Sequence, residues 1–184
     1  MIVICPYHPT KRLDAQEETF KAQQKVFYDN NDAEILITRQ PCENDEDYYN
    51  LLKKYWGKDD ILIWEHDIVA DKNNILELYL CDKNICAFDY KRTDGFNSMH
   101  RIMLNKDPNQ RQPINEAVDY ADFVGFGFTK ISIEAQKEIP IESFNSNGWP
   151  TLDTEFSYKM IEKQYLGHIH RPALKHNHNL DNFK

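Results

Sequence analysis

The sequence predicts an α/β domain with a twisted, mostly parallel sheet and helices on both of its faces. In the first half of the chain, short apolar runs of strand length alternate with stretches of helical periodicity. The strand-like runs are Ile2 to Cys5, Glu34 to Thr38, Ile61 to Trp64 and Cys86 to Tyr90. This alternation is typical of βαβ units, in which consecutive strands run parallel and the helices between them cover the sheet.

Three helices are expected between these strands. Asp14 can cap the first of them, and Glu17, three residues later, completes a capping-box pattern. The other two follow the spacing of amphipathic helices, at Tyr48, Leu51, Leu52 and Tyr55 and at Ile75, Leu76, Tyr79 and Leu80. In a sheet wound in this way, ligands bind beyond the carboxyl ends of the strands.

The regular pattern stops between Lys91 and Ala121, a stretch with scattered charges and no sustained periodicity. A long unpatterned stretch in a compact domain is usually a functional lid or a mobile segment. Its basic residues are expected either to close over a phosphate or acceptor or to lie in a solvated loop: Lys91, Arg92, Arg101, Lys106 and Arg111. Order returns in a strand-like stretch at 122–133, where Gly125 and Gly127 would allow close approach of a ligand or another backbone.

Length and charge limit the classes of protein that the sequence fits. The 184 residues are expected to form one domain, 1–184. A formal net charge of −8 argues against nucleic-acid binding, because phosphate backbones recruit Lys and Arg. No apolar stretch approaches the roughly 18 residues of a membrane span, and no secretion signal follows Met1, so a cytoplasmic protein is expected.

The four cysteines lack the spacing of a zinc or redox motif, and reduced thiols are the expected state in the cytoplasm. Two of them, Cys81 and Cys86, flank a predicted helix-to-strand turn and could lie close together. The sequence leaves open whether they pair and whether the chain forms a homodimer.

The most informative stretch is the apolar run that ends at Glu65, His66 and Asp67. Along an extended chain, side chains alternate between faces, so Glu65 and Asp67 are expected to face the same point at the end of a buried strand. Two carboxylates in such a place suit a divalent cation and, through it, a phosphate group. The alternative is a solvated strand end with two surface acids.

Histidines are concentrated near the C-terminus, at His168, His170, His176 and His178. Each His-x-His pair would face one way if extended. His176 and His178 are therefore candidates to share one site with Glu65 and Asp67. Two alternatives remain: an inert solvated tail, or a separate zinc site built from these imidazoles.

Asp153 opens a third patterned segment, Trp149 to Met160. An acid at the start of a helix is most often an N-cap. It can equally act as a general base held at a helix N-terminus, and Glu155 is a rival for that role.

Taken in order, these pieces resemble glycosyltransferases of the GT-A fold. The pieces are the acidic triplet of ILIWEHDIVAD, the Gly-rich VGFGFTKIS, the acid of TLDTEFSYKM and a late histidine. In detail they are similar to the small GT-A proteins encoded by some phages and archaeal viruses, which would place the protein in a host cytoplasm.

The resemblance implies a metal-dependent transfer of a sugar from a nucleoside-diphosphate sugar, UDP- or GDP-linked, to an acceptor hydroxyl. Glu65 and Asp67 fall where the family's DxD motif holds Mn²⁺ or Mg²⁺ on the diphosphate, with His66 between them. His176 falls where a C-terminal histidine often completes the metal shell, and His178 is the close alternative.

The same resemblance implies roles for residues elsewhere in the chain. Asp153 matches the acid that deprotonates the acceptor in inverting members. Pro6 and Tyr7 match a turn that lies against the nucleotide, and Gly125 and Gly127 would line the sugar side.

One departure and two rival functions are left open. Many members carry an acid after the second strand to read the base, whereas this chain has Thr38, Arg39 and Gln40 there. A nucleotidyltransferase acting on a sugar phosphate would use a similar sheet, but it normally needs a glycine in the loop after the first strand, and PYHPTKR has none. The other rival is a non-catalytic module that binds nucleotide and metal.

Overall fold

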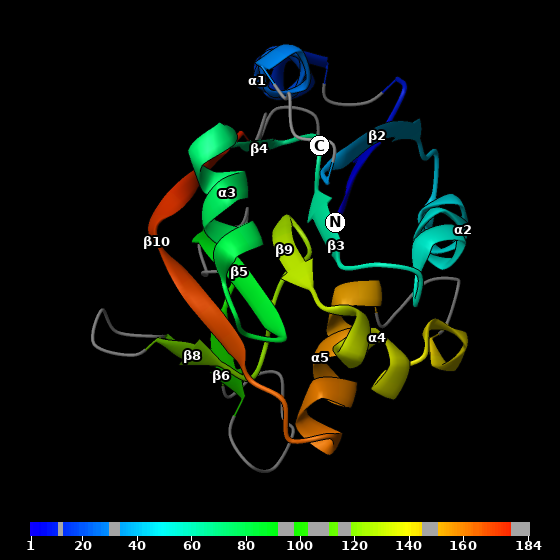
Figure 1. The fold of residues 1–184 in the computed structure, drawn as a ribbon, viewed down its shortest axis with the longest axis vertical. Helices are drawn as coiled ribbons and strands as arrows, with labels where there is room; N and C mark the ends of the chain where they lie inside the picture. The colour runs from blue at the N-terminus through cyan, green and yellow to red at the C-terminus, as the bar shows by residue number, and fades with distance from the viewer. Residues whose placement is uncertain are drawn as a thin grey trace.

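A mixed sheet of eight strands forms the centre of the molecule (Figure 1). The computed structural model describes residues 1–10, 13–29, 34–91, 98–102, 111–113, 119–144 and 151–177. The strands of this sheet are β1 (Ile2–Tyr7), β2 (Leu36–Pro41), β3 (Ile61–Trp64), β4 (Ile68–Val69), β5 (Ile85–Tyr90), β8 (Tyr120–Ala121), β9 (Phe128–Ile131) and β10 (Gly167–His176). Their spatial order is β2-β1-β3-β9-β5-β10-β4, and β8 pairs with β10.

Most strands of the sheet share one direction, as the sequence predicted. Five of the eight described strands (β1, β2, β3, β5 and β10) run the same way, and β9, β4 and β8 run opposite. Strand β9 lies between β3 and β5 and is antiparallel to both. The predicted fold class, α/β with helices on both faces, is confirmed.

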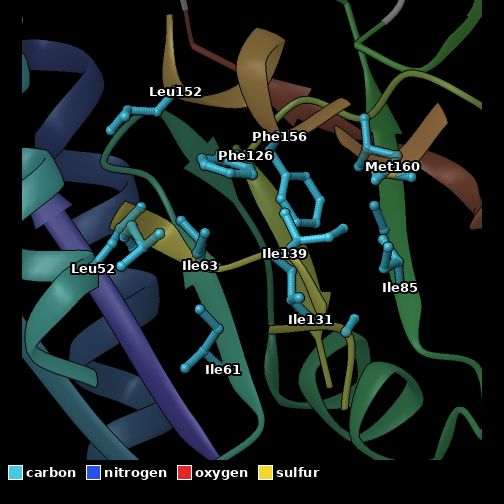
Figure 2. Packing of buried hydrophobic residues seen from close by; sticks show 14 of the residues in the cluster. Leu52, Ile61, Ile63, Ile85, Phe126, Ile131, Ile139, Leu152, Phe156 and Met160 are labelled. Atoms are coloured by element: carbon cyan, nitrogen blue, oxygen red, sulfur yellow. The ribbon is translucent and has the colours of Figure 1, made fainter. Parts of the chain in front are cut away.

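Two hydrophobic cores lie on opposite faces of the sheet, because side chains alternate along each strand. In β3, Ile61 and Ile63 enter one core, and Leu62 and Trp64 enter the other. The first core is covered by α2 (Asp45–Tyr55), α4 (Ile133–Glu138), the 3-10 helix η2 (Ile141–Ser143) and α5 (Leu152–Glu162). The second is covered by α1 (Leu13–Asp29) and α3 (Lys72–Leu80). Figure 2 shows the first core, where residues of β3, β5 and β9 meet side chains of α2 and α5.

Two predicted features of the N-terminal half differ in the structure. Strand β1 continues through Pro6 and Tyr7, which were expected in a turn. Strand β3 pairs with β1 only as far as Ile4, so the missing N–H of Pro6 leaves no ladder bond unmade on that side. Helix α1 begins at Leu13, so Asp14 lies in its first turn and not at the predicted N-cap position.

Two further differences lie in the second half. Strand β9 begins at Phe128, so Gly125 and Gly127 precede the strand in which they were expected. The ten-residue strand β10 was not predicted as a strand, because its alternating polar residues carry little of the apolar signal of a buried strand. It nevertheless pairs with β5, β8 and β4.

Only parts of the unpatterned stretch 91–121 lie within the described residues. There, β6 (His100–Ile102) pairs antiparallel with β7 (Arg111–Pro113), and β8 joins the main sheet. Arg92 and Lys106, two of the predicted basic contacts, lie outside the described residues. No helix within the described ranges is long and apolar enough to cross a membrane.

Candidate functional site

The acidic triplet forms the turn that joins β3 to β4. The Ile68 N–H donates to the Glu65 carbonyl over 3.3 Å, and the Trp64 indole N–H donates to the Ile68 carbonyl over 2.8 Å. The predicted extended geometry is therefore wrong for these residues. Strand β4 runs opposite to β3, so the chain has to reverse direction here, and a turn accomplishes the reversal.

Asp67 meets His176, as the sequence predicted. The two strands that carry them pair with His176 opposite Ile68, and the Asn177 N–H donates to the Asp67 carbonyl over 2.8 Å. This pairing brings His176 Nε2 to 3.2 Å from Asp67 Oδ2. Both side chains are largely buried, with exposed fractions of 8% and 4%.

The other nitrogen of His176 is held by the main chain. His176 Nδ1 lies 2.6 Å from the Lys91 carbonyl oxygen. Because a carbonyl oxygen only accepts, Nδ1 carries a proton and Nε2 is the nitrogen that faces Asp67. Metal-binding histidines are commonly oriented in this way, by a backbone carbonyl on the nitrogen away from the ion.

Glu65 is fixed by a tyrosine from a helix on one face of the sheet. The Tyr48 hydroxyl, on α2, donates to Glu65 Oε1 over 2.8 Å. The main chain of Glu65 is held as well, since its N–H donates to the Gly127 carbonyl over 2.8 Å. Tyr48 was predicted only as an apolar position of its helix, and its hydroxyl gave no separate signal in the sequence.

A second buried tyrosine, Tyr90, lies among the predicted acids. Burial raises its pKa well above 10.0, and the negative charges of Glu65, Asp153 and Asp67 raise it further. The pKa of Tyr48 is raised by burial, then by Glu65, Asp153 and Tyr90. Burial and the negative charge of the carboxylates therefore hold both phenols in their neutral form.

The space beside Gly125 and Gly127 holds the Tyr90 side chain. A Cβ on Gly127 would lie 2.5 Å from two ring carbons of Tyr90, and one on Gly125 would lie 2.7 Å from its hydroxyl oxygen. The Gly127 N–H donates to that hydroxyl over 3.1 Å, and the Tyr90 ring packs against His176 with centroids 4.8 Å apart. The close approach predicted at these glycines is that of a side chain, and their role toward a sugar stays a prediction.

Asp153 lies in the first turn of α5, but it is not the cap. The N-cap residue is Thr151, and Asp153 Oδ1 accepts hydrogen bonds from the Thr151 hydroxyl and, over 2.8 Å, from the Thr154 N–H. Glu155 follows about 200° further round the helix, so the two acids leave from different faces. The negative charge of Asp153 contributes to the raised pKa of both Tyr48 and Tyr90.

Tyr7 lies beside the residue that departs from the family pattern. The Arg39 guanidinium stacks 3.7 Å from the centroid of the Tyr7 ring and 4.4 Å from that of Phe20, and its Nε donates to Gln23 Oε1 over 3.2 Å. Pro6 pairs with Gln40 across β1 and β2. The first two strands therefore end in a basic and aromatic group where the resemblance implied an acid.

Not all predicted histidines join this site. His168 and His170 lie near the start of β10, at the other end of the strand from His176. His178 lies outside the described residues. His66 occupies the middle of the turn between the two acids. The structure thus brings together Asp67 and His176, a carboxylate and an imidazole that suit a divalent cation such as Mn²⁺, while Glu65 lies in the same turn as Asp67.

Comparison of the sequence with protein-family models and with curated proteins gives no match. Solved structures share the fold. A197 from STIV superposes with a TM-score of 0.59 over 97% of this chain and 85% of its own, at 16% identity. The β-1,4-galactosyltransferase 7 of Drosophila superposes with a TM-score of 0.57 over 100% of this chain and 73% of its own, at 11% identity.

Weaker structural matches include other nucleotide-using enzymes. An inositol-1-phosphate CTP transferase from T. maritima covers 91% of this chain and 84% of its own at 11% identity, with a TM-score of 0.48 that is too low to support an argument. The two higher scores confirm the resemblance to the GT-A fold. At these identities the fold is what is shared.

Proposed function

We propose that this chain is a metal-dependent, inverting glycosyltransferase that moves a sugar from a nucleoside-diphosphate sugar to an acceptor hydroxyl. The observation that carries the proposal is the buried pairing of Asp67 with His176, whose Nδ1 is held by a backbone carbonyl. It is the arrangement expected of an imidazole prepared to bind a cation together with a carboxylate.

Three residues would hold the cation: Asp67, His176 and Glu65. Asp67 is the firmest of these ligands because it is buried and lies directly against the imidazole. Glu65 is shared with the Tyr48 hydroxyl, and it would reach the ion directly or through water. A bound Mn²⁺ or Mg²⁺ supplies the positive charge that neutralises a departing diphosphate.

The other residues act on the acceptor and on the charge balance of the site. We assign Asp153 as the base that takes the proton from the acceptor hydroxyl, a role worth about 10²–10⁴-fold in rate. Its place in the first turn of α5 puts its negative charge at the positive end of the helix dipole. Tyr48 and Tyr90 would stay protonated, because burial and the negative charge of the carboxylates raise their pKa values.

The structural comparisons support the donor proposed here. The Drosophila galactosyltransferase was crystallised with manganese, UDP-Gal and xylobiose, and 73% of its chain superposes on the whole of the present chain. One base and one displacement imply inversion at the anomeric carbon, where the transition state resembles an oxocarbenium ion. Arg39, stacked on Tyr7, lies where many family members carry the acid that reads the base. Titration with both donor classes therefore decides between a UDP- and a GDP-linked sugar.

Calorimetric titration tests the binding part of the proposal. UDP-glucose, UDP-galactose and GDP-mannose are titrated into the protein with and without Mn²⁺. At least one donor is expected to bind only with the metal, and Asp67→Asn and His176→Ala are expected to abolish that dependence. Asp82→Asn is the matched control, since Asp82 is an exposed acid paired with Lys83 at the surface.

Release of nucleoside diphosphate, measured with a panel of acceptor sugars, tests the base. Asp153→Asn is expected to lose transfer by about 10²-fold or more while donor and Mn²⁺ binding are kept. Glu155→Gln, two residues along the same helix, is expected to keep the wild-type rate. Normal turnover by Asp153→Asn would refute the assignment.

The two rival functions give different results in the same assays. A nucleotidyltransferase would release pyrophosphate from a nucleoside triphosphate and a sugar phosphate, a reaction for which the sequence after β1 lacks the glycine-containing phosphate loop. A binding module would show metal-dependent donor binding with no transfer to any acceptor. Absence of metal-dependent binding for every donor would overturn the proposed function.

A further inference from the structure

A second group of metal-binding side chains lies at the opposite end of β10 from His176. It consists of Cys81, Cys86, His168 and His170, whose ligand atoms all lie within 4.8 Å of one another. Cys81 ends helix α3, and Cys86 lies in β5 directly opposite His168 in β10. His170 follows two residues later, so both imidazoles project from the same face of the strand.

Two of the spacings among these nitrogen and sulfur atoms fit one tetrahedral ion. With Zn–N near 2.0 Å and Zn–S near 2.3 Å, tetrahedral geometry sets N···N at about 3.3 Å and S···N at about 3.5 Å. His168 Nδ1 lies 3.2 Å from His170 Nε2, and Cys81 Sγ lies 3.6 Å from His168 Nδ1. Both distances agree with the expected ones within about 0.1 Å.

The imidazole of His170 is already oriented for such a role. Its Nδ1 lies 2.6 Å from Glu77 Oε1, on helix α3. A carboxylate only accepts, so Nδ1 carries the proton and Nε2 offers its lone pair to the cluster. A carboxylate behind a histidine is the usual partner of a zinc-bound imidazole, and it also strengthens the ligand.

We propose that Cys81, Cys86, His168 and His170 bind one Zn²⁺ ion as a structural site. Each thiol gives up its proton as its sulfur binds, so one ion releases two protons, and the imidazoles bind as neutral rings. Two thiolates balance the charge of the ion. With four protein ligands the site has no open position, which is the mark of a structural site and not a catalytic one.

The competing arrangement is a disulfide between the two cysteines. In this structure the sulfurs of Cys81 and Cys86 form a disulfide, and their Cα atoms lie 7.0 Å apart. Most disulfides span about 4.4–6.8 Å between Cα atoms, whereas two thiolates on one ion are not held to that limit. A disulfide also does not explain why nitrogens of His168 and His170 lie close to these two sulfurs. Nor does it explain why Glu77 holds the ring of His170.

The proposed ion would tie together three parts of the fold. It links the end of α3 to the beginnings of β5 and β10. At its other end β10 carries His176 to Asp67, so the zinc would fix the strand on which the candidate functional site depends. The two sites share a strand but no ligand.

Metal analysis of the full chain tests the proposal. The protein is purified without added reductant from cells grown with zinc, and zinc is measured by mass spectrometry after gel filtration. About one Zn²⁺ per chain is expected, and Co²⁺ exchange should give the visible absorption of a tetrahedral thiolate complex. Thiol titration after chelation and denaturation should find all four cysteines reactive.

Variants separate this site from other zinc binding. Cys86→Ser and His170→Ala are expected to lose the ion, whereas Cys42→Ser, another buried thiol, and His176→Ala should keep it. Glu77→Ala, a change at a half-exposed position, is expected to bind zinc about 10–100-fold more weakly in competition with a chromogenic chelator.

Three results would overturn the proposal. One is wild-type protein with less than about one-tenth equivalent of zinc after growth with zinc. Another is only two reactive thiols in freshly purified protein, which would establish the disulfide. The third is stoichiometric zinc that survives Cys86→Ser and His170→Ala but is lost with Asp67→Asn, which would place the ion in the other site.

Discussion

Replacing Gly127 by alanine tests the steric basis of the candidate site. The new Cβ would lie 2.5 Å from two ring carbons of Tyr90, whereas ordinary contact begins at 3.4 Å, so the ring would have to retreat by about 0.9 Å. The ring has little room to do so. It is buried and packs against His176, and its hydroxyl lies close to the main chain at Gly125.

The cost of this change has two parts. Overpacking of a buried ring costs about 1–3 kcal/mol. Displacing the Tyr90 hydroxyl also breaks its hydrogen bond from the Gly127 N–H, worth about 1 kcal/mol. The total of about 2–4 kcal/mol should lower the Tm by roughly 4–16 °C in a chain of this size. It should also weaken Mn²⁺ binding, because His176 rests on the displaced ring.

Thermal unfolding by calorimetry at pH 7 measures the effect, and a double mutant identifies its cause. Adding Gly127→Ala to Tyr90→Ala should cost little further, because the ring that clashes is gone. The coupling energy between the two changes should therefore be about 2–4 kcal/mol. Gly57→Ala is the control, since no neighbour lies within 4 Å of its Cβ and its cost comes from a φ of +73°.

Two results would refute this reasoning. A Tm within about 2 °C of the wild type would mean that the Tyr90 ring moves aside without a measurable loss of stability. A cost of Gly127→Ala that is the same with and without the Tyr90 ring would mean that the clash is not with that ring. Gly57→Ala is expected to behave in that additive way.

The remaining predictions concern the same end of the sheet. Tyr48→Phe removes the hydroxyl that donates to Glu65 and should lower the free energy of unfolding by about 1.5–3 kcal/mol, measured by urea titration; an unchanged midpoint would contradict it. The folded pKa values of Tyr48 and Tyr90 are raised above 10.0, so their contribution to stability is complete below about pH 10 and is lost as the pH rises further. Stability should therefore fall between pH 9 and 11, and Tyr90→Phe should show a smaller loss over that interval than the wild type; an equal loss would count against the buried phenol. Arg39→Ala removes the guanidinium stacked on Tyr7 and should destabilise the protein by about 1–2 kcal/mol, whereas a cost below about 0.3 kcal/mol would show that the stacking is weak.

The candidate site depends on strand β10, which the sequence did not reveal as a strand. Its histidines were predicted as candidates because of their number and spacing, and only the pairing of β10 with β4 and β5 shows where each belongs. His176 meets Asp67, whereas His168 and His170 meet the two cysteines. The histidines of this one strand therefore belong to two separate clusters.

The sequence by itself determined the features that depend on local order along the chain. Apolar runs of strand length and helical spacing indicated the α/β class and most of the first-half elements, and the abrupt end of an apolar run at Glu65 and Asp67 indicated the candidate site. The position of Asp153 at the start of a helix could also be predicted from local order.

Only the tertiary structure decided which of these residues meet. The turn at Glu65 replaced the extended geometry because β4 runs back against the direction of β3, and the glycines before β9 proved to make room for Tyr90. Contacts of this kind join residues far apart in the chain, and they are fixed by strand pairing and packing in three dimensions. The spacing of apolar residues along the sequence does not predict these contacts.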